Sequence, residues 1–211
     1  MTEYLVPTRP SETQFTEKRS TFIGHVWPAA SEEEARACID EMKKKYHDAR
    51  HNCWCYRIKD GPVRYSDDGE PQGTAGQPML NVFEREAVEN VCCVVTRYFG
   101  GVLLGAGGLV RAYTQSAKSA LDGAGISVVR RWVEALLPCP YSWHDRVRLE
   151  IERLGGTVAE TDYGADVCFT VLLPEERAQE ILDAVLDLSA GQIEGIVSGE
   201  RFQDVPWRER V

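Results

Sequence analysis

The last third of the chain carries the pattern that most restricts its fold, a regular alternation of strand-like and helix-like segments. Strands are predicted at 134–141, 157–161, 166–173 and 193–202. One helix is predicted from about Ser142, a candidate N-cap, to Leu154, which precedes two glycines. A second helix begins at Pro174, where apolar residues follow at helical spacing. The order β-α-β-β-α-β predicts a ferredoxin-like domain.

The N-terminal part also mixes strands and helices. Helices are expected at 31–46, where Ser31 and Glu34 form a capping box, and at 79–87 and 109–121. Strands are expected at 20–27, 52–58, 63–65, 91–98 and 126–129. We therefore predict an α+β protein of two domains, residues 1–133 and 134–211.

Charge is divided unevenly between these two parts. Residues 1–130 contain 16 basic and 17 acidic residues, whereas residues 131–211 contain 8 and 16. Because affinity for nucleic acid comes largely from cations, a polyanion contact is expected in the N-terminal part. The acidic C-terminal part could instead select a basic protein partner.

Seven scattered cysteines and a start without an apolar export segment predict reduced thiols and a cytoplasmic protein. The longest apolar stretch, 102–110, is shorter than the about 20 residues of a membrane helix, so no membrane association is expected. Cys53 and Cys55 are two residues apart on a predicted strand, so their side chains point to the same face. This favours a role as small buried hydrophobic residues over a role as metal ligands. No metal and no cofactor are expected.

A glycine-rich segment follows the buried strand 91–98 and leads into a helix near Gly108. Free N–H groups at a helix start favour an anion, and Arg97 and Arg111 could add bidentate phosphate contacts. Alternatively, the glycines only permit tight packing, and Arg111 is solvated or salt-bridged. The candidate anion-binding or nucleic-acid-binding residues are Arg97, Gly100, Gly101, Gly105, Gly107, Gly108, Arg111, Lys18 and Arg19.

An acidic loop precedes this segment, at 66–78, with three carboxylates within four positions. They could bind Mg²⁺ or act as an acid/base pair; alternatively, the two aspartates accept hydrogen bonds from backbone N–H groups. His51 is interpreted either as a buried structural histidine or as a residue that lines a cleft together with these carboxylates. The candidate second wall of a cleft comprises Asp67, Asp68, Glu70, Thr74 and His51.

Long motifs in these regions resemble the YigZ/IMPACT family. They are 19–22, His51-Asn-Cys53, 65–78 and 96–113. The resemblance implies an N-terminal α/β sandwich similar to domain 2 of ribosomal small-subunit protein five and to the matching domain of elongation factor G. It also implies a ferredoxin-like C-terminal domain similar to the last domain of that factor. The resemblance also implies a function: the eukaryotic branch looks like a translational regulator, and the bacterial branch is implied to act near ribosomes or RNA.

The leading hypothesis is a monomeric, non-enzymatic binding protein linked to translation. Its expected partner, the ribosome, RNA or a translation-related protein, would contact the N-terminal glycine loop. The alternative is a small enzyme acting on a phosphorylated or nucleotide substrate, with Mg²⁺ held by Asp67, Asp68 and Glu70.

Overall fold

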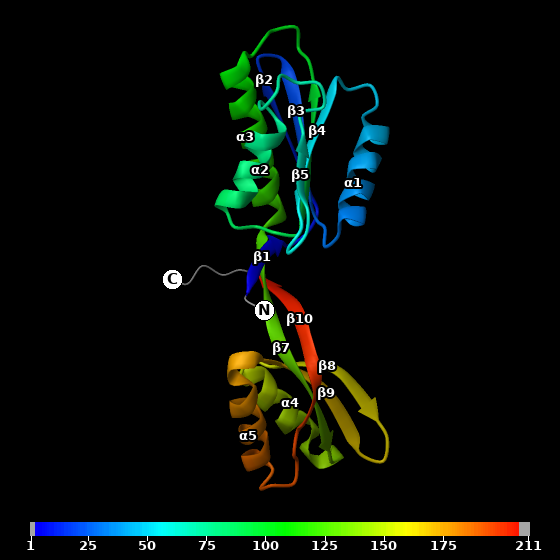
Figure 1. Cartoon of the computed structure of the whole chain (residues 1–211). Coiled ribbons are helices and arrows are strands. Elements are labelled where there is room, and N and C mark those ends of the chain that lie inside the picture. Colours follow the sequence, from blue (N-terminus) through cyan, green and yellow to red (C-terminus); the bar gives the residue numbers. More distant parts are fainter. Residues whose placement is uncertain (1–2, 207–211) are drawn as a thin grey trace. The chain divides into compact units, whose positions relative to one another are not determined.

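The computed structural model describes residues 3–206, and for residues 203–206 the backbone alone. The chain divides into two compact units, which comprise mainly Tyr4–Val128 and Val129–Gln203. Each unit combines a β-sheet with helices (Figure 1). The predicted α+β class with two domains is confirmed; residues 1, 2 and 207–211 of the predicted domains lie outside the described residues.

The N-terminal unit contains a five-stranded sheet in the order β2-β3-β6-β4-β5, in which neighbouring strands are antiparallel. Two strands, β1 and β2, were not predicted. Strand β2 is largely polar and partly exposed, so its sequence lacks a clear alternation of apolar and polar residues. The strands of this sheet are β2 (Ser11–Glu17), β3 (Ser20–Pro28), β4 (His51–Arg57), β5 (Val63–Ser66) and β6 (Val91–Tyr98). Strand β1 (Tyr4–Pro7) lies outside this sheet and pairs with the later strand Ile126–Cys139.

Helices cover both faces of this sheet (Figure 1). Helix α1 (Glu32–Lys45) packs on one face, and helices α2 (Gly76–Arg85) and α3 (Ala106–Ala124) pack on the other. Strand β6 is therefore buried on both faces, from Val91 to Arg97. Cys53 and Cys55 lie in the core beneath α2 and α3, as expected of small hydrophobes. The predicted cap is present, with the Glu34 N–H donating to Ser31 Oγ at 3.2 Å.

Strands β2 and β3 are joined by a two-residue turn, Lys18-Arg19, in which both residues have positive φ, 45° and 66°. Positive φ at both central positions is what the hairpin turn of type I′ requires, and glycine or asparagine usually supplies it. The turn therefore places two basic side chains in a backbone region that they rarely adopt.

The C-terminal unit has the predicted β-α-β-β-α-β order, and its sheet order, β10-β7-β9-β8, is that of the ferredoxin-like fold. Short 3₁₀ turns, Tyr141–Trp143 and Glu175–Arg177, precede its two helices. Its elements are β7 (Ile126–Cys139), α4 (His144–Arg153), β8 (Thr157–Tyr163), β9 (Val167–Pro174), α5 (Ala178–Leu188) and β10 (Ile196–Pro206).

Strand β7 differs from its prediction as two strands, 126–129 and 134–141. It is continuous, and the two units divide inside it, between Val128 and Val129. The charged pair Arg130-Arg131 lies within the strand; Arg130 pairs with Glu3 at 2.8 Å, and Arg131 pairs with Glu175 at 2.8 Å. No helix of the described residues is both long enough and apolar enough to cross a membrane.

Candidate anion-binding site

Helix α3 begins with uncapped backbone amides. Gly105, with φ of 73°, precedes the helix, and its carbonyl accepts the N–H of Leu109 at 2.9 Å. No side chain caps this end, and the N–H groups of Ala106, Gly107 and Gly108 have no acceptor among the described residues. Such a helix end carries a partial positive charge and open donors, which favour an anion.

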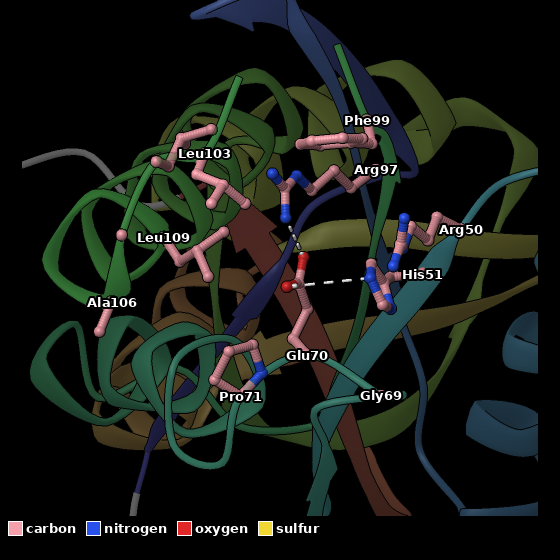
Figure 2. Close-up of a pocket in the computed structure, with 12 residues that line it drawn as sticks. Arg50, His51, Gly69, Glu70, Pro71, Arg97, Phe99, Leu103, Ala106 and Leu109 are labelled. Carbon is pink, nitrogen blue, oxygen red and sulfur yellow. Dashed lines mark hydrogen bonds and ion pairs between the residues drawn. The ribbon is translucent and has the colours of Figure 1, made fainter. Parts of the chain in front are cut away.

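A cavity of about 360 Å³, called here the first pocket, lies beside this helix end (Figure 2). Its volume is in the range of small-molecule sites. Its polar side chains are Arg50, His51, Glu70 and Arg97. Its apolar wall is formed by Pro71, Phe99, Leu103, Leu104 and Leu109.

The predicted phosphate ligand Arg97 is already engaged at this site. Its Nη1 donates to Glu70 Oε1 at 2.6 Å, and its Nη2 donates to Ser20 Oγ at 3.4 Å. The Arg97 and Glu70 side chains are 5% and 4% exposed, so the pair is buried. The Tyr113 hydroxyl also donates to Glu70 Oε1, at 2.9 Å. Arg97 therefore fixes Glu70 at the pocket wall, which corrects its expected role as a bidentate phosphate clamp.

No activated nucleophile lies in this network. The Cys53 thiol contacts Tyr113 and donates to the Asp67 carbonyl at 3.0 Å. Burial raises the pKa of the Cys53 thiol and also that of the Tyr113 hydroxyl. Both groups are therefore held protonated, whereas a catalytic thiol needs a lowered pKa.

His51 presents an unpartnered ring nitrogen to the first pocket. Its Nδ1 lies 2.8 Å from the carbonyl oxygen of Asp68, which can only accept, so Nδ1 carries the hydrogen. Its Nε2 lies 3.9 Å from Glu70 Oε2 (Figure 2), and neither atom has a hydrogen-bond partner among the described residues. His51 and Glu70 are only 9% and 8% exposed. Each of these two mostly buried side chains thus has one polar atom that no described residue engages by a hydrogen bond.

A second pocket, of about 150 Å³, shares Leu104 with the first. Lys18, Gly108 and Arg111 line it, together with the acidic Glu17. The two predicted guanidinium groups, of Arg97 and Arg111, therefore belong to different pockets, which corrects the expectation of a single joint clamp. Arg111 is exposed and reaches back along α3, where its Nη1 lies beside Gly107.

Four cations around these two pockets make no ion pair with a described residue. They are Lys18, Arg19, Arg50 and Arg111, all exposed. Most other cations of the N-terminal unit are paired: Arg36, Lys43, Lys45, Arg57, Lys59, Arg64, Arg97 and Lys118. These four cations without an ion pair therefore lie near the start of α3 and in the β2–β3 turn.

Gly100 and Gly101 shape the loop after β6 instead of lining a pocket. The Gly100 N–H donates to Ser20 Oγ at 3.2 Å, and its Cα packs directly against the backbone of Arg19. Gly101 has a φ of 82°. These residues hold the β2–β3 turn against the β6–α3 loop.

The acidic loop does not form the predicted wall. Asp67 caps the start of α2, where its Oδ1 accepts the N–H groups of Ala75 at 3.0 Å and Gly76 at 2.9 Å. Asp68 accepts the Asn52 N–H at 2.7 Å, and the Thr74 hydroxyl donates to the Pro71 carbonyl at 2.6 Å. These three residues line neither pocket. Of the predicted wall, only Glu70 and His51 face the first pocket.

The magnesium hypothesis is not supported by this arrangement. Within residues 3–206, no three His, Cys, Asp or Glu side chains are grouped so that they could hold a metal ion. The oxygens of Asp67 bind the backbone, and Glu70 is paired with Arg97. The alternative reading of the two aspartates, as acceptors for backbone N–H groups, is the one that the structure shows.

Replacing Asp67 with alanine is expected to lower the free energy of unfolding by about 1–2 kcal/mol, because α2 loses its cap. Thermal denaturation measures this loss. Added Mg²⁺ is expected to leave the Tm of the unsubstituted protein unchanged. A Mg²⁺-dependent rise that disappears in Asp67→Ala would instead restore the metal hypothesis.

The sequence analysis did not name eight of the residues that line the first pocket, among them Arg50, Phe99 and Leu103. The Phe99 ring lies 5.5 Å from the Arg97 guanidinium and 5.6 Å from that of Arg50. Leu103 is 82% exposed. Arg50 directly precedes the His51 motif, which is the one sequence signal that pointed toward it.

Comparisons with known proteins cover both units. The model of the Impact N-terminal domain matches residues 18–121, and that of a domain of unknown function (DUF1949) matches residues 137–192. The chain is 34% identical to the IMPACT family member YvyE of Bacillus subtilis, over 90% of this chain and 88% of that one. It is 33% identical to the IMPACT family member YigZ of Escherichia coli, over 92% and 97%.

One further relative and one solved structure cover very different shares of this chain. Protein IMPACT of Mus musculus is 37% identical over 43% of this chain and 30% of its own. A solved structure described as the crystal structure of a hypothetical protein aligns with a TM-score of 0.60 at 32% identity, and covers 94% of this chain and 98% of that one.

Proposed function

Since the chain belongs to the IMPACT family, we propose that it is a translation-associated binding protein whose N-terminal unit binds the phosphates of RNA. The observation that carries this proposal is a group of four cations that make no ion pair with a described residue: Arg50, Lys18 and Arg111 line the two pockets, and Arg19 lies beside Lys18 in the turn. RNA phosphates are anions spaced along a chain, so they suit several separate cations better than one closed clamp.

The arrangement of these cations supports a path for a single strand. Arg50 lines the first pocket, and Lys18 and Arg111 line the second. The open amides of α3 lie between them and supply uncharged donors for a phosphate oxygen. Phe99 and Leu103, both exposed at the first pocket, offer apolar surface for an unstacked base.

Family membership supports the translational context. Its relatives include proteins named IMPACT in eukaryotes, and the family resemblance implies domains similar to those of elongation factor G and ribosomal small-subunit protein five. The acidic C-terminal part is poorly suited to a phosphate contact, which leaves the N-terminal unit as the proposed RNA-binding part.

Replacing Arg50 and Arg111 together with glutamine is expected to weaken binding of a single-stranded oligoribonucleotide and to flatten its salt dependence. Each lost phosphate contact lowers the slope of log K against log salt by about 0.7 for single strands. Fluorescence anisotropy over a range of salt concentrations measures both quantities.

The matched control is the double variant Lys44→Gln and Arg85→Gln. Both residues are exposed and unpaired among the described residues, and neither lines a pocket. Its affinity and salt slope are expected to match those of the unsubstituted protein. Equal losses in both double variants would mean that RNA binding reflects net charge alone, which contradicts a site at α3.

A further inference from the structure

The first pocket contains two acceptor atoms that the proposed binding of phosphate does not use, Glu70 Oε2 and His51 Nε2. Glu70 is oriented by Arg97 and Tyr113, which both donate to its other oxygen. His51 is oriented by its Nδ1 hydrogen bond to the Asp68 carbonyl. In the neutral ring Nε2 is therefore an acceptor as well. Two acceptors 3.9 Å apart call for two donors from the ligand.

From these contacts we infer that the first pocket binds the 3′-terminal nucleotide of an RNA and recognises its vicinal 2′ and 3′ hydroxyls at Glu70 Oε2 and His51 Nε2. The inference rests on the proposed function, that RNA binds at this unit. Neighbouring hydroxyls carry one donor hydrogen each, so the two acceptors are both satisfied. An internal nucleotide has one free hydroxyl and leaves one acceptor buried without a partner, which is costly.

The rest of the pocket suits the other parts of a nucleotide. The open amides after Gly105 are donors for the 5′-phosphate, whereas Arg50 lies on the opposite side of the pocket beside His51 (Figure 2). Leu103 and Leu109 give an apolar wall for the base on one side of the pocket, and Phe99 lies apart from them beside Arg97 (Figure 2). The base meets no fixed donor or acceptor on that wall, so the site would read the sugar end of the chain and not its sequence.

The test compares RNAs of one sequence that differ only at the 3′ end, with the intact protein at fixed low salt. One RNA ends in the free diol, one in a 2′-deoxynucleotide and one in a 3′-phosphate. The diol RNA is expected to bind about tenfold more tightly than the other two, the effect of losing one hydrogen bond to a charged or buried partner. Equal affinity for the three RNAs would overturn the inference.

A protein variant provides the second arm. In His51→Asn the amide can still donate to the Asp68 carbonyl, but no atom replaces Nε2. This variant is expected to bind the diol RNA about as weakly as it binds the other two RNAs, so that most of the preference for the diol is lost. A full preference in His51→Asn would also overturn the inference. Absence of any salt-dependent RNA binding would overturn the proposed function itself, so the two failures are distinguishable.

Discussion

Replacing Glu70 with leucine is expected to lower the free energy of unfolding of the N-terminal unit by about 3–5 kcal/mol. The substitution leaves the Arg97 guanidinium buried without its carboxylate and removes the acceptor of the Tyr113 hydroxyl. An uncompensated buried charge costs more than the lost attraction alone. Chemical denaturation followed by circular dichroism measures the change.

A double variant separates two quantities: the loss of stability from leaving one buried charge unpaired, and the net contribution of the intact Arg97–Glu70 pair to stability. Glu70→Leu with Arg97→Met removes both charges and is expected to recover much of the loss, because the surroundings are apolar side chains such as Phe22 and Phe99. Arg153→Met, which breaks an exposed pair with Glu150, serves as the control and is expected to cost less than about 1 kcal/mol. A similarly small loss in Glu70→Leu would show that the pair is not structurally coupled.

Gly100→Ala is the second substitution for which a large effect is expected. A Cβ at this position would overlap the carbonyl carbon and oxygen of Arg19, which are backbone atoms and cannot rotate away. The hairpin turn would have to move off the β6–α3 loop and break the hydrogen bond between Gly100 and Ser20. We expect a loss of about 3 kcal/mol or more, in the range of severe overpacking, measured by thermal denaturation.

Gly199→Ala is the matched control for this prediction. No atom lies within 4 Å of a Cβ at Gly199, and its φ is not positive. Its stability is therefore expected to stay within about 0.5 kcal/mol of the unsubstituted protein. A comparably small effect of Gly100→Ala would mean that the turn moves freely against the loop.

The features that the sequence predicted well are those encoded by local patterns. The β-α-β-β-α-β order follows from periodic apolar residues and from the glycines that end the first C-terminal helix, and the capping box at Ser31 follows from a spacing of three. The open start of α3 was also expected near the right place, two residues after its observed position at Ala106. Each of these signals lies within a few residues of the element it specifies.

The features that it missed depend on residues distant in the chain. Arg97 looks like a free cation at a strand end, but Glu70, 27 positions earlier, and Ser20, 77 positions earlier, are placed beside it by the fold. Asp67 looks like a metal ligand until α2 folds back and presents its amides. Arg50 carried no pattern beyond its place before the His51 motif, and the pocket identifies it as a lining residue. Local propensity contains no information about such partners.

The turn at Lys18-Arg19 has a consequence for binding. An Asn-Gly pair would adopt the same positive φ values at lower conformational cost, so the chain forgoes stability there and carries two positive charges instead. Those charges lie on a hairpin that packs against Gly100, not on a flexible tail. Because the turn is already ordered, its backbone loses little conformational entropy when a polyanion binds. More of the electrostatic attraction therefore appears as affinity.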